Sequence, residues 1–193
     1  MKQLPPTKNE AKTAALFRYI VDNGFEHSLD KIARELHLTQ RTLLYRYGSK
    51  EAMFLFIMAY WRKQWQSCFE AQAEDCNQVV EKLLLFILRL RESYTDEQPF
   101  FLRENEEKNF FNSALPHSFF SILKTLLIDG INQDYFEEIN SDIYAKLLLY
   151  NIINIFIIAN EPFDYLKYIL LPLLTEKGKN MLNAIDIERF FAG

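Results

Sequence analysis

Glycine and proline are scarce in this chain, with five glycines and six prolines in 193 residues. These residue types supply most tight turns, so a sheet of many short strands would lack turn material. Long intervals without either type, such as Lys50 to about Glu74, instead predict long helices. The apolar fraction of 49% suffices for a packed core. We therefore predict an all-α fold.

The charge of the chain is divided unevenly between its two parts. Residues 1–63 contain 11 Lys and Arg against 6 Asp and Glu, a net charge of +5, whereas residues 64–193 contain 11 against 20, a net of −9. A basic segment ahead of an acidic one suits a protein that contacts phosphate with one end only. The length admits one small domain and one larger. We expect domains at residues 1–50 and 51–193.

Three features bear on compartment and redox state. Met1–Asn9 is polar and lacks the apolar core of a secretory signal, so we expect a cytoplasmic protein. The longest apolar run, Leu147–Ala159, has 13 residues and predicts a buried helix, because a bilayer span needs about 20. Cys68 and Cys76 lie eight residues apart in a helix or its end, and we expect both to be free thiols.

Apolar periodicity and capping residues predict three short helices before residue 50. The first extends from Lys8 to Val21 and is closed by Asn23 and Gly24. Ser28 is placed to cap the second, Leu29–Leu36, whose apolar residues form one stripe. After a turn at His37 and Leu38, Thr39 is placed to cap the third.

The third helix divides into two faces. Leu43 and Tyr47 point inward, whereas Gln40, Arg41, Leu44 and Tyr45 share the opposite face, with Thr42 and Arg46 alongside. Gly48 and Ser49 end this helix, and Lys50 begins a long one at a terminus where N–H groups and an ammonium could both contact a phosphate. An outward face of this kind after a helix and a tight turn is typical of a recognition helix in the major groove.

The segment Ser28–Met53, SLDKIARELHLTQRTLLYRYGSKEAM, resembles the TetR family of bacterial repressors. The matching positions are Ile32, Ala33, Leu38, Thr39, Thr42, Leu43, Tyr47, Ser49, Lys50 and Glu51. A second segment, Ile128–Phe136 (IDGINQDYF), is similar to the run that often precedes the family's eighth helix. The resemblance implies an N-terminal three-helix helix-turn-helix domain and a larger C-terminal helical domain that binds an effector and dimerises.

Three positions depart from the family pattern. His37 stands where the family usually has glycine, Leu44 where it favours tyrosine, and Arg46 where it favours tyrosine or histidine. Leu44 cannot donate a hydrogen bond, but Tyr45 and Arg46 could supply substitutes. The candidate DNA contacts are Ser28, Thr39, Gln40, Arg41, Thr42, Leu44, Tyr45, Arg46 and Lys50.

Six further helices are predicted behind the long one. They are Gln78–Ser93, Pro99 to about Asn112, Pro116 to about Gln133, Asp142–Asn160, Pro162–Thr175 and Asn180–Phe190.

The helix Asp142–Asn160 is apolar almost all round, so a second copy of the chain is an economical cover for it. The resemblance likewise implies a homodimer through Asp142–Asn160 and Pro162–Thr175. Asn151 and Asn154 could pair across the two-fold axis, or equally face solvent or a pocket. Such a dimer would bind double-stranded DNA at a near-palindromic operator, with half-sites about 34 to 36 Å apart or more.

The resemblance also implies a ligand cavity in the second domain. The predicted lining is Trp65, Phe86, Arg89, Phe111, Phe119 and Tyr150, and an aromatic lining favours a flat or hydrophobic compound. Most of the aromatic residues there are ordinary core. The implied function is a repressor that a small hydrophobic or aromatic ligand releases from DNA.

Signatures of catalysis are not found. The sequence contains no Gly-rich phosphate loop, no His-Glu-x-x-His and no Gly-x-Ser-x-Gly, and its three histidines fall in or beside predicted turns. We therefore expect no enzyme, no cofactor and no metal site. The alternative function is a helical protein-binding regulator with a degenerate DNA-binding domain, in which the acidic second domain binds another protein. A gel shift separates the two.

Overall fold

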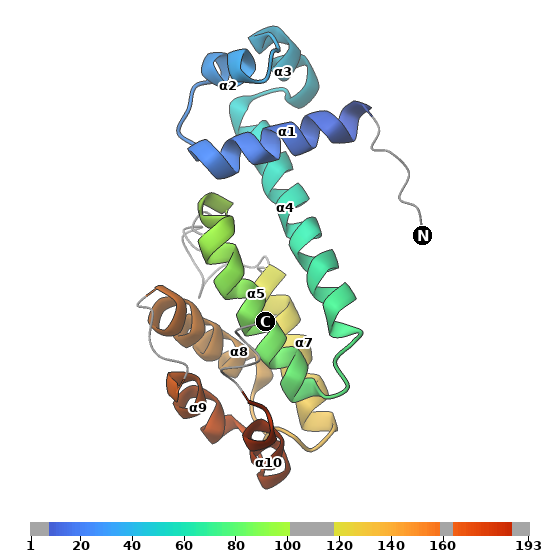
Figure 1. Cartoon of the computed structure of the whole chain (residues 1–193), viewed down its shortest axis with the longest axis vertical. Helices are drawn as coiled ribbons and strands as arrows, with labels where there is room; N and C mark the ends of the chain where they lie inside the picture. Colours follow the sequence, from blue (N-terminus) through green and yellow to red (C-terminus); the bar gives the residue numbers. More distant parts are fainter. Residues whose placement is uncertain (1–7, 101–117, 159–163, 187–193) are drawn as a thin grey trace.

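The structure is a computed structural model that describes residues 8–100, 118–158 and 164–186. It is elongated, with a small group of helices at one end, one long helix leading away from it, and a larger bundle at the other end (Figure 1). Within the described residues the structure contains helices and one isolated β-bridge. No helix among them is both long enough and apolar enough to cross a membrane. The predicted all-α class is confirmed.

The small end, which we call the head, consists of α1 (Lys8–Asn23), α2 (Leu29–Glu35), α3 (Gln40–Tyr47) and the first half of α4 (Lys50–Ala73). These bounds confirm the predicted helices to within two residues. The head's core is apolar and almost fully buried, and includes Leu16, Ile20, Ile32, Leu43 and Met53.

Five of the helices begin with the same kind of side-chain N-cap. A side-chain oxygen of the residue just before the helix accepts a hydrogen bond from the backbone N–H three residues later, which satisfies a donor that has no partner within the helix. The residues are Ser28, Thr39, Ser49, Asn140 and Thr175, with donor-acceptor distances of 3.1 to 3.3 Å. The first three fix the starts of α2, α3 and α4; the caps at Ser28 and Thr39 were predicted from the sequence, whereas the cap at Ser49 was not.

The larger end, which we call the body, is built around α5 (Val79–Asp96), with α7 (Ser118–Asn132) packed beside it and α8 (Ser141–Tyr150) packed against α7. Nine residues of α5 are buried, so this helix is covered on most of its sides. It begins one residue later and ends three residues later than predicted. The helix predicted at Pro99–Asn112 lies almost wholly outside the described residues.

The segment Ile128–Phe136 joins α7 to the approach of α8, where its sequence predicts it. Gly130 lies against the ring of Phe136, and a Cβ at position 130 would overlap that ring. Phe136 is buried. Glycine is therefore required here by close packing.

The helix predicted from Asp142 to Asn160 is not one regular helix. It is α-helical to Tyr150 and becomes a π-helix, η1, from Asn151 to Ile158. The Asn151 amide donates to the Leu147 carbonyl oxygen at 2.8 Å, and Asn154 donates to that of Tyr150 at 3.1 Å. Both amides therefore bond to their own helix one turn back. Ala159 and Asn160 lie outside the described residues.

Two C-terminal predictions were also wrong in their bounds. In place of one helix over Pro162–Thr175, the chain forms α9 (Asp164–Leu170) and a 3-10 turn, η2 (Leu171–Leu173). The last helix, α10, spans Glu176–Ala184, not Asn180–Phe190. Thr175 caps it and also donates to the Asp134 carbonyl oxygen at 2.8 Å. A long-range contact therefore helps to set where this helix begins.

Candidate functional site

The outer end of the head carries α3. The turn before it closes α2 with paired backbone bonds, from His37 N–H to the Arg34 carbonyl at 3.1 Å and from Leu38 N–H to the Ala33 carbonyl at 2.8 Å. His37 adopts φ +53°, the left-handed conformation that this helix ending requires. A glycine adopts that conformation without strain, which gives a physical reason for the family's preference at this position.

The inward face of α3 anchors it to the head. Leu43 is 2% exposed. The Tyr47 ring lies 5.2 Å from the Phe56 ring of α4, centroid to centroid. At the end of the helix Gly48 has φ +83°, so the chain turns sharply into α4.

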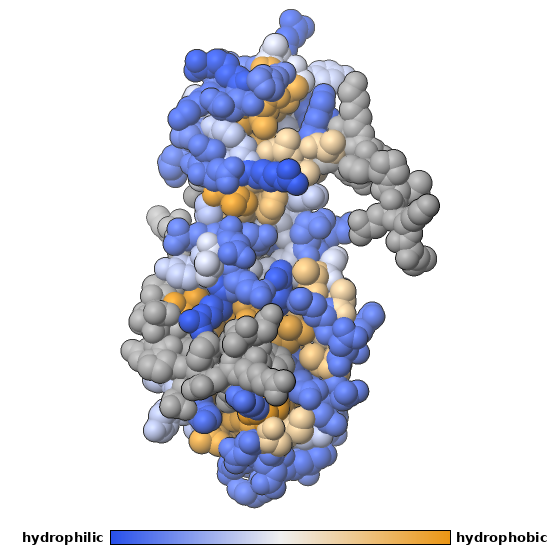
Figure 2. Space-filling model, viewed as in Figure 1, coloured by the Kyte–Doolittle hydropathy of each residue, from blue (hydrophilic) through white to orange (hydrophobic). Residues whose placement is uncertain are grey.

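The outward face of α3 is open to solvent. Gln40, Arg41, Thr42 and Leu44 are exposed, and Tyr45 is 94% exposed. On the face shown in Figure 2, the end of the head remote from the body is largely hydrophilic. Side chains on this surface can donate several hydrogen bonds, and one of them carries the positive charge of a guanidinium. A ligand as wide as a DNA groove could contact these side chains together.

The remaining predicted DNA contacts surround this face but are partly engaged. Ser28 and Thr39 use their side-chain oxygens as caps. The Arg46 guanidinium carbon lies 5.9 Å from the Tyr47 ring centroid, and the Lys50 ammonium 5.1 Å from that of Phe54. These stacked positions restrict where the two cations point.

The α4 N-terminus carries a negative as well as a positive charge. A hydrogen bond with its own backbone and one from Ser49 lower the pKa of Glu51, which keeps this carboxyl group ionised. A phosphate at this terminus would therefore meet the Lys50 ammonium and the Glu51 carboxylate together.

Lys31 on α2 is a further cation of the head that sequence reasoning missed. Its ammonium lies 2.8 Å from Nε2 of His27, whose Nδ1 lies 2.6 Å from the Tyr19 hydroxyl. Burial and the charge of Glu35 raise the pKa of Tyr19, so the hydroxyl keeps its proton. The four-residue spacing of His27 and Lys31 was the signal available in the sequence.

In the body, three of the predicted lining residues meet in one aromatic cluster. The Trp65 ring lies 5.7 Å from that of Phe86 and 4.8 Å from that of Phe119. All three are almost fully buried. The Trp65 indole N–H donates to the Ser93 hydroxyl of α5 at 2.7 Å.

The other predicted lining residues are placed differently. Arg89 is part-buried beside this cluster on α5 and pairs with Glu92. Tyr150 is exposed on the outside of α8, so the structure does not bring it to the cluster. Phe111 lies outside the described residues.

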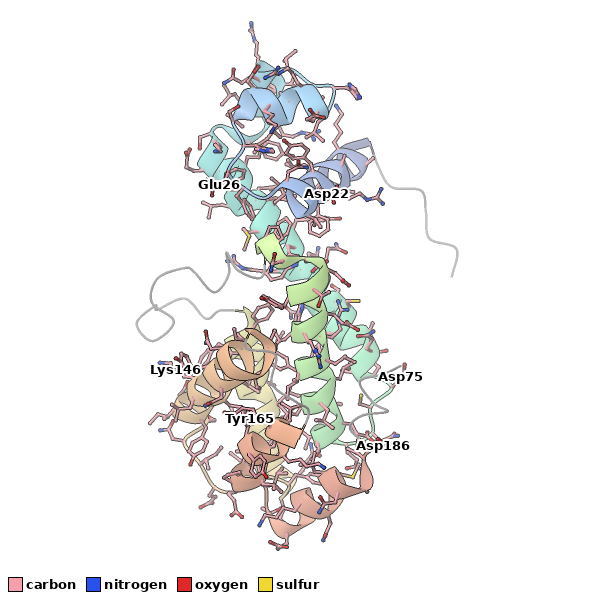
Figure 3. All side chains as sticks on the ribbon, turned by 60° about the vertical axis from the view of Figure 1, so that its left-hand side comes forward. Asp22, Glu26, Asp75, Lys146, Tyr165 and Asp186 are labelled. Carbon is pink, nitrogen blue, oxygen red and sulfur yellow. The ribbon has the colours of Figure 1, made fainter. Side chains whose placement is uncertain are left out.

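The outer side of α8 and α9 exposes large apolar side chains. Leu147 is 48% exposed and Tyr168 is 75% exposed, and Ile143, Tyr144 and Tyr150 are also exposed. A shallow groove beside them is lined by Tyr144, Leu147, Leu148, Asn151, Ile169, Pro172 and Leu173. Figure 3 locates this region by Lys146 on α8 and Tyr165 on α9, away from Asp22 and Glu26 of the head.

The sequence matches no protein-family model and no curated protein. Comparison of structures gives close matches over nearly the whole chain. CprB from S. coelicolor A3(2), described as a TetR family protein, matches with a TM-score of 0.66 at 16% identity over 96% of this chain and 98% of that one. The chain has the TetR fold.

Two other structures that match are both named FadR. FadR of Bacillus halodurans, a fatty acid degradation regulator, matches with a TM-score of 0.65 at 15% identity, covering 90% of this chain and 98% of that chain. The transcriptional regulator FadR of Bacillus subtilis, solved with stearoyl-CoA, matches with a TM-score of 0.61 at 18% identity, covering 88% and 99%. The resemblance of the segment Ser28–Met53 to the TetR family is thus confirmed at the level of the fold.

Proposed function

We propose that this protein is a homodimeric, sequence-specific DNA-binding transcriptional regulator, in which residues 1–50 bind DNA and residues 51–193 dimerise and bind an effector. The observation that carries this proposal is the orientation of α3. Leu43 anchors the helix while Arg41 and Tyr45 face solvent at the outer end of an elongated molecule. The surplus of positive charge in residues 1–63 supports the same function, because phosphate contacts supply most of the affinity for DNA.

A second copy of the chain accounts for the exposed apolar side of α8 and α9. Covering Leu147 and its neighbours by a partner's equivalent surface forms a two-fold interface in which each subunit uses the same patch. Two heads on one frame sum their phosphate and base contacts. The operator is then near-palindromic, with half-sites about 34 to 36 Å apart or more.

We propose that the regulator is a repressor that a small hydrophobic effector releases from DNA. Trp65, at the centre of the aromatic cluster, belongs to α4, which runs from the body into the head, so a ligand at the cluster bears on the helix that positions α3. The TetR-fold match solved with stearoyl-CoA supports an effector with an apolar chain. Effector and DNA then weaken each other's binding by the same factor, because the coupling free energy is shared.

The DNA-binding proposal is tested by fluorescence anisotropy with fragments from upstream of the chain's own gene and its neighbours. The double variant Arg41→Ala with Lys50→Ala is expected to lose binding at least about a hundred-fold, because two phosphate or base contacts disappear. The matched control is Lys63→Ala with Lys82→Ala, which removes the same charge away from α3 and from the proposed dimer interface, and is expected to bind within about three-fold of wild type.

Salt separates DNA binding from the alternative. Between about 50 and 200 mM salt we expect wild-type affinity for DNA to fall by at least about ten-fold, because phosphate contacts release counterions. A protein that binds no fragment even at the lower salt would instead favour the protein-binding regulator with a degenerate DNA-binding domain.

A further inference from the structure

Among the described residues, one buried side-chain nitrogen has no hydrogen-bond partner: Nε of Arg89 on α5. Within the described residues the guanidinium pairs with Glu92 through Nη1 at 2.5 Å, and the side chain as a whole is 19% exposed. Buried polar groups in folded proteins almost always have a partner, since a donor taken out of water without one bears its full desolvation cost. This N–H therefore calls for an acceptor that the described part of the chain does not supply.

The position of Arg89 on α5 places it beside the aromatic cluster. Phe86 precedes it by three residues and Ser93 follows it by four, so the three side chains lie along one side of the helix. Trp65 of α4 contacts both neighbours, through a ring contact at 5.7 Å with Phe86 and a hydrogen bond of 2.7 Å to Ser93. A group bound at the Nε edge of Arg89 would consequently lie next to Trp65.

Other buried polar groups beside α5 do have partners, as the indole N–H groups of the two tryptophans show. Trp61 donates to Glu97 at 2.6 Å, and Trp65 donates to Ser93. Apolar side chains in place of both Arg89 and Glu92 would leave no orphaned donor, and replacement of a whole buried ion pair by apolar residues is commonly neutral or stabilising. The arginine is thus poorly explained as a packing residue.

We propose that Arg89 binds the carboxylate of an amphiphilic effector, whose apolar part lies against the cluster of Trp65, Phe86 and Phe119. This inference rests on the proposed role of the body as an effector domain and names the chemical class of the effector. Nε and Nη2 form the planar edge of a guanidinium that matches the two oxygens of a carboxylate. The Glu92 carboxylate already lies beside the guanidinium of Arg89, so a second negative charge on the ligand would be repelled more strongly than one. The site therefore suits a monoanion better than a phosphate dianion.

The test uses two pairs of probes that differ only in the head group: decanoate against decanol, and phenylpropanoate against phenylpropanol. Binding to the full-length protein is followed by tryptophan fluorescence, since Trp65 adjoins the site and the chain's only other tryptophan, Trp61, lies on the same helix. Wild type is expected to bind at least one acid about ten-fold or more tightly than its alcohol, the gain of a charge-assisted hydrogen bond over a neutral one.

Substitutions at Arg89 separate this role from a structural one. Arg89→Met removes the guanidinium and is expected to abolish the preference for the acid while alcohol binding stays within about three-fold. Arg89→Lys keeps the charge without the planar fork and restores part of the preference. Arg91→Met on the same helix is the matched control and keeps the full preference. If Arg89→Met fails to fold, Arg89→Gln, which retains a polar side chain of similar reach, replaces it.

The inference is overturned if wild type binds acid and alcohol equally, if neither pair binds, or if Arg89→Met keeps the preference for the acid. DNA binding is measured separately on the same proteins. Arg89→Met should bind the operator as wild type does but no longer release it with the acid. If the wild-type protein does not bind DNA, the proposed function is refuted, but the measured preference for the carboxylate is unaffected.

Discussion

In the head, each of α2 and α3 fully buries only one or two side chains and exposes most of the others, whereas α5 in the body is buried on most of its sides. The head therefore presents its chemistry outward on a thin core, and the body gathers its aromatic residues inward. A unit of about 50 residues buries too little surface to be stable with a wide margin. We therefore expect the head to depend on contacts with the body for its stability.

Phe100 is a contact of that kind. It follows α5, whose C-terminal end lies beneath α1 (Figure 1), and its side chain is fully buried. Its ring lies 4.9 Å from Phe17 of α1, 5.2 Å from Phe25 and 5.8 Å from Trp61 of α4. The Phe100 side chain, which belongs to the body, thus packs against two residues of the head. It also packs against α4, the helix that joins the head to the body.

The largest effect is expected from Phe100→Ala. Removing this ring leaves a cavity at the junction and should lower the free energy of unfolding by about 3 to 5 kcal/mol. Because the lost contacts join head and body, calorimetry should resolve a separate, earlier transition for the head. Leu55→Ala, which truncates a 62% exposed apolar side chain of α4, is the control and should change stability far less. A single transition at the wild-type temperature would show that the head is stable without this contact.

The next effect contrasts the two faces of α3. Leu43→Ala should destabilise the protein by about 2 to 5 kcal/mol, since this side chain is 2% exposed and anchors the helix. Tyr45→Ala, from the 94% exposed face, should change stability by less than about 0.5 kcal/mol but weaken DNA binding at least about ten-fold. Chemical denaturation and anisotropy measure both variants. If Tyr45→Ala binds DNA normally, the outward face does not read the operator.

The head was predicted closely because its signals are local. Ser28, Thr39 and Ser49 cap the next helix through neighbours three residues away, and the apolar period of α3 separates Leu43 from Tyr45. The partial engagement of Lys50 with Phe54 was not predicted, because it depends on the side-chain conformation.

The body was predicted less well because long-range contacts decide it. The change from α- to π-helix at Asn151 alters hydrogen-bond spacing without altering the apolar pattern. The start of α10 depends on Thr175 bonding across to Asp134, 41 residues away in sequence. The structure brings Trp65, Phe86 and Phe119 together, but Tyr150 faces outward, since composition alone does not say which side of an apolar helix is covered.

A third prediction concerns the exposed side of α8. Leu147→Glu places a charge on a residue that is 48% exposed in the single chain and buried in the proposed dimer. The lost apolar burial is about 1 kcal/mol per subunit, and charge desolvation adds to it, so the dimer dissociation constant should rise at least about ten-fold. Analytical ultracentrifugation measures this change. Ile128→Glu on α7 is the control, and equal dissociation in both variants would place the interface elsewhere.

The smallest effect is expected at two residues with a left-handed backbone conformation, one in the head and one in the body. His37 in the head has φ +53° and Asp134 in the body has φ +61°. His37→Gly should raise the free energy of unfolding by about 0.5 kcal/mol, because relief of backbone strain slightly exceeds the entropy that glycine adds to the unfolded chain. Asp134→Gly should gain less, since aspartate tolerates this conformation better than most residues. Urea denaturation resolves both, and a loss of stability in His37→Gly would mean that the imidazole makes a stabilising contact in the turn before α3.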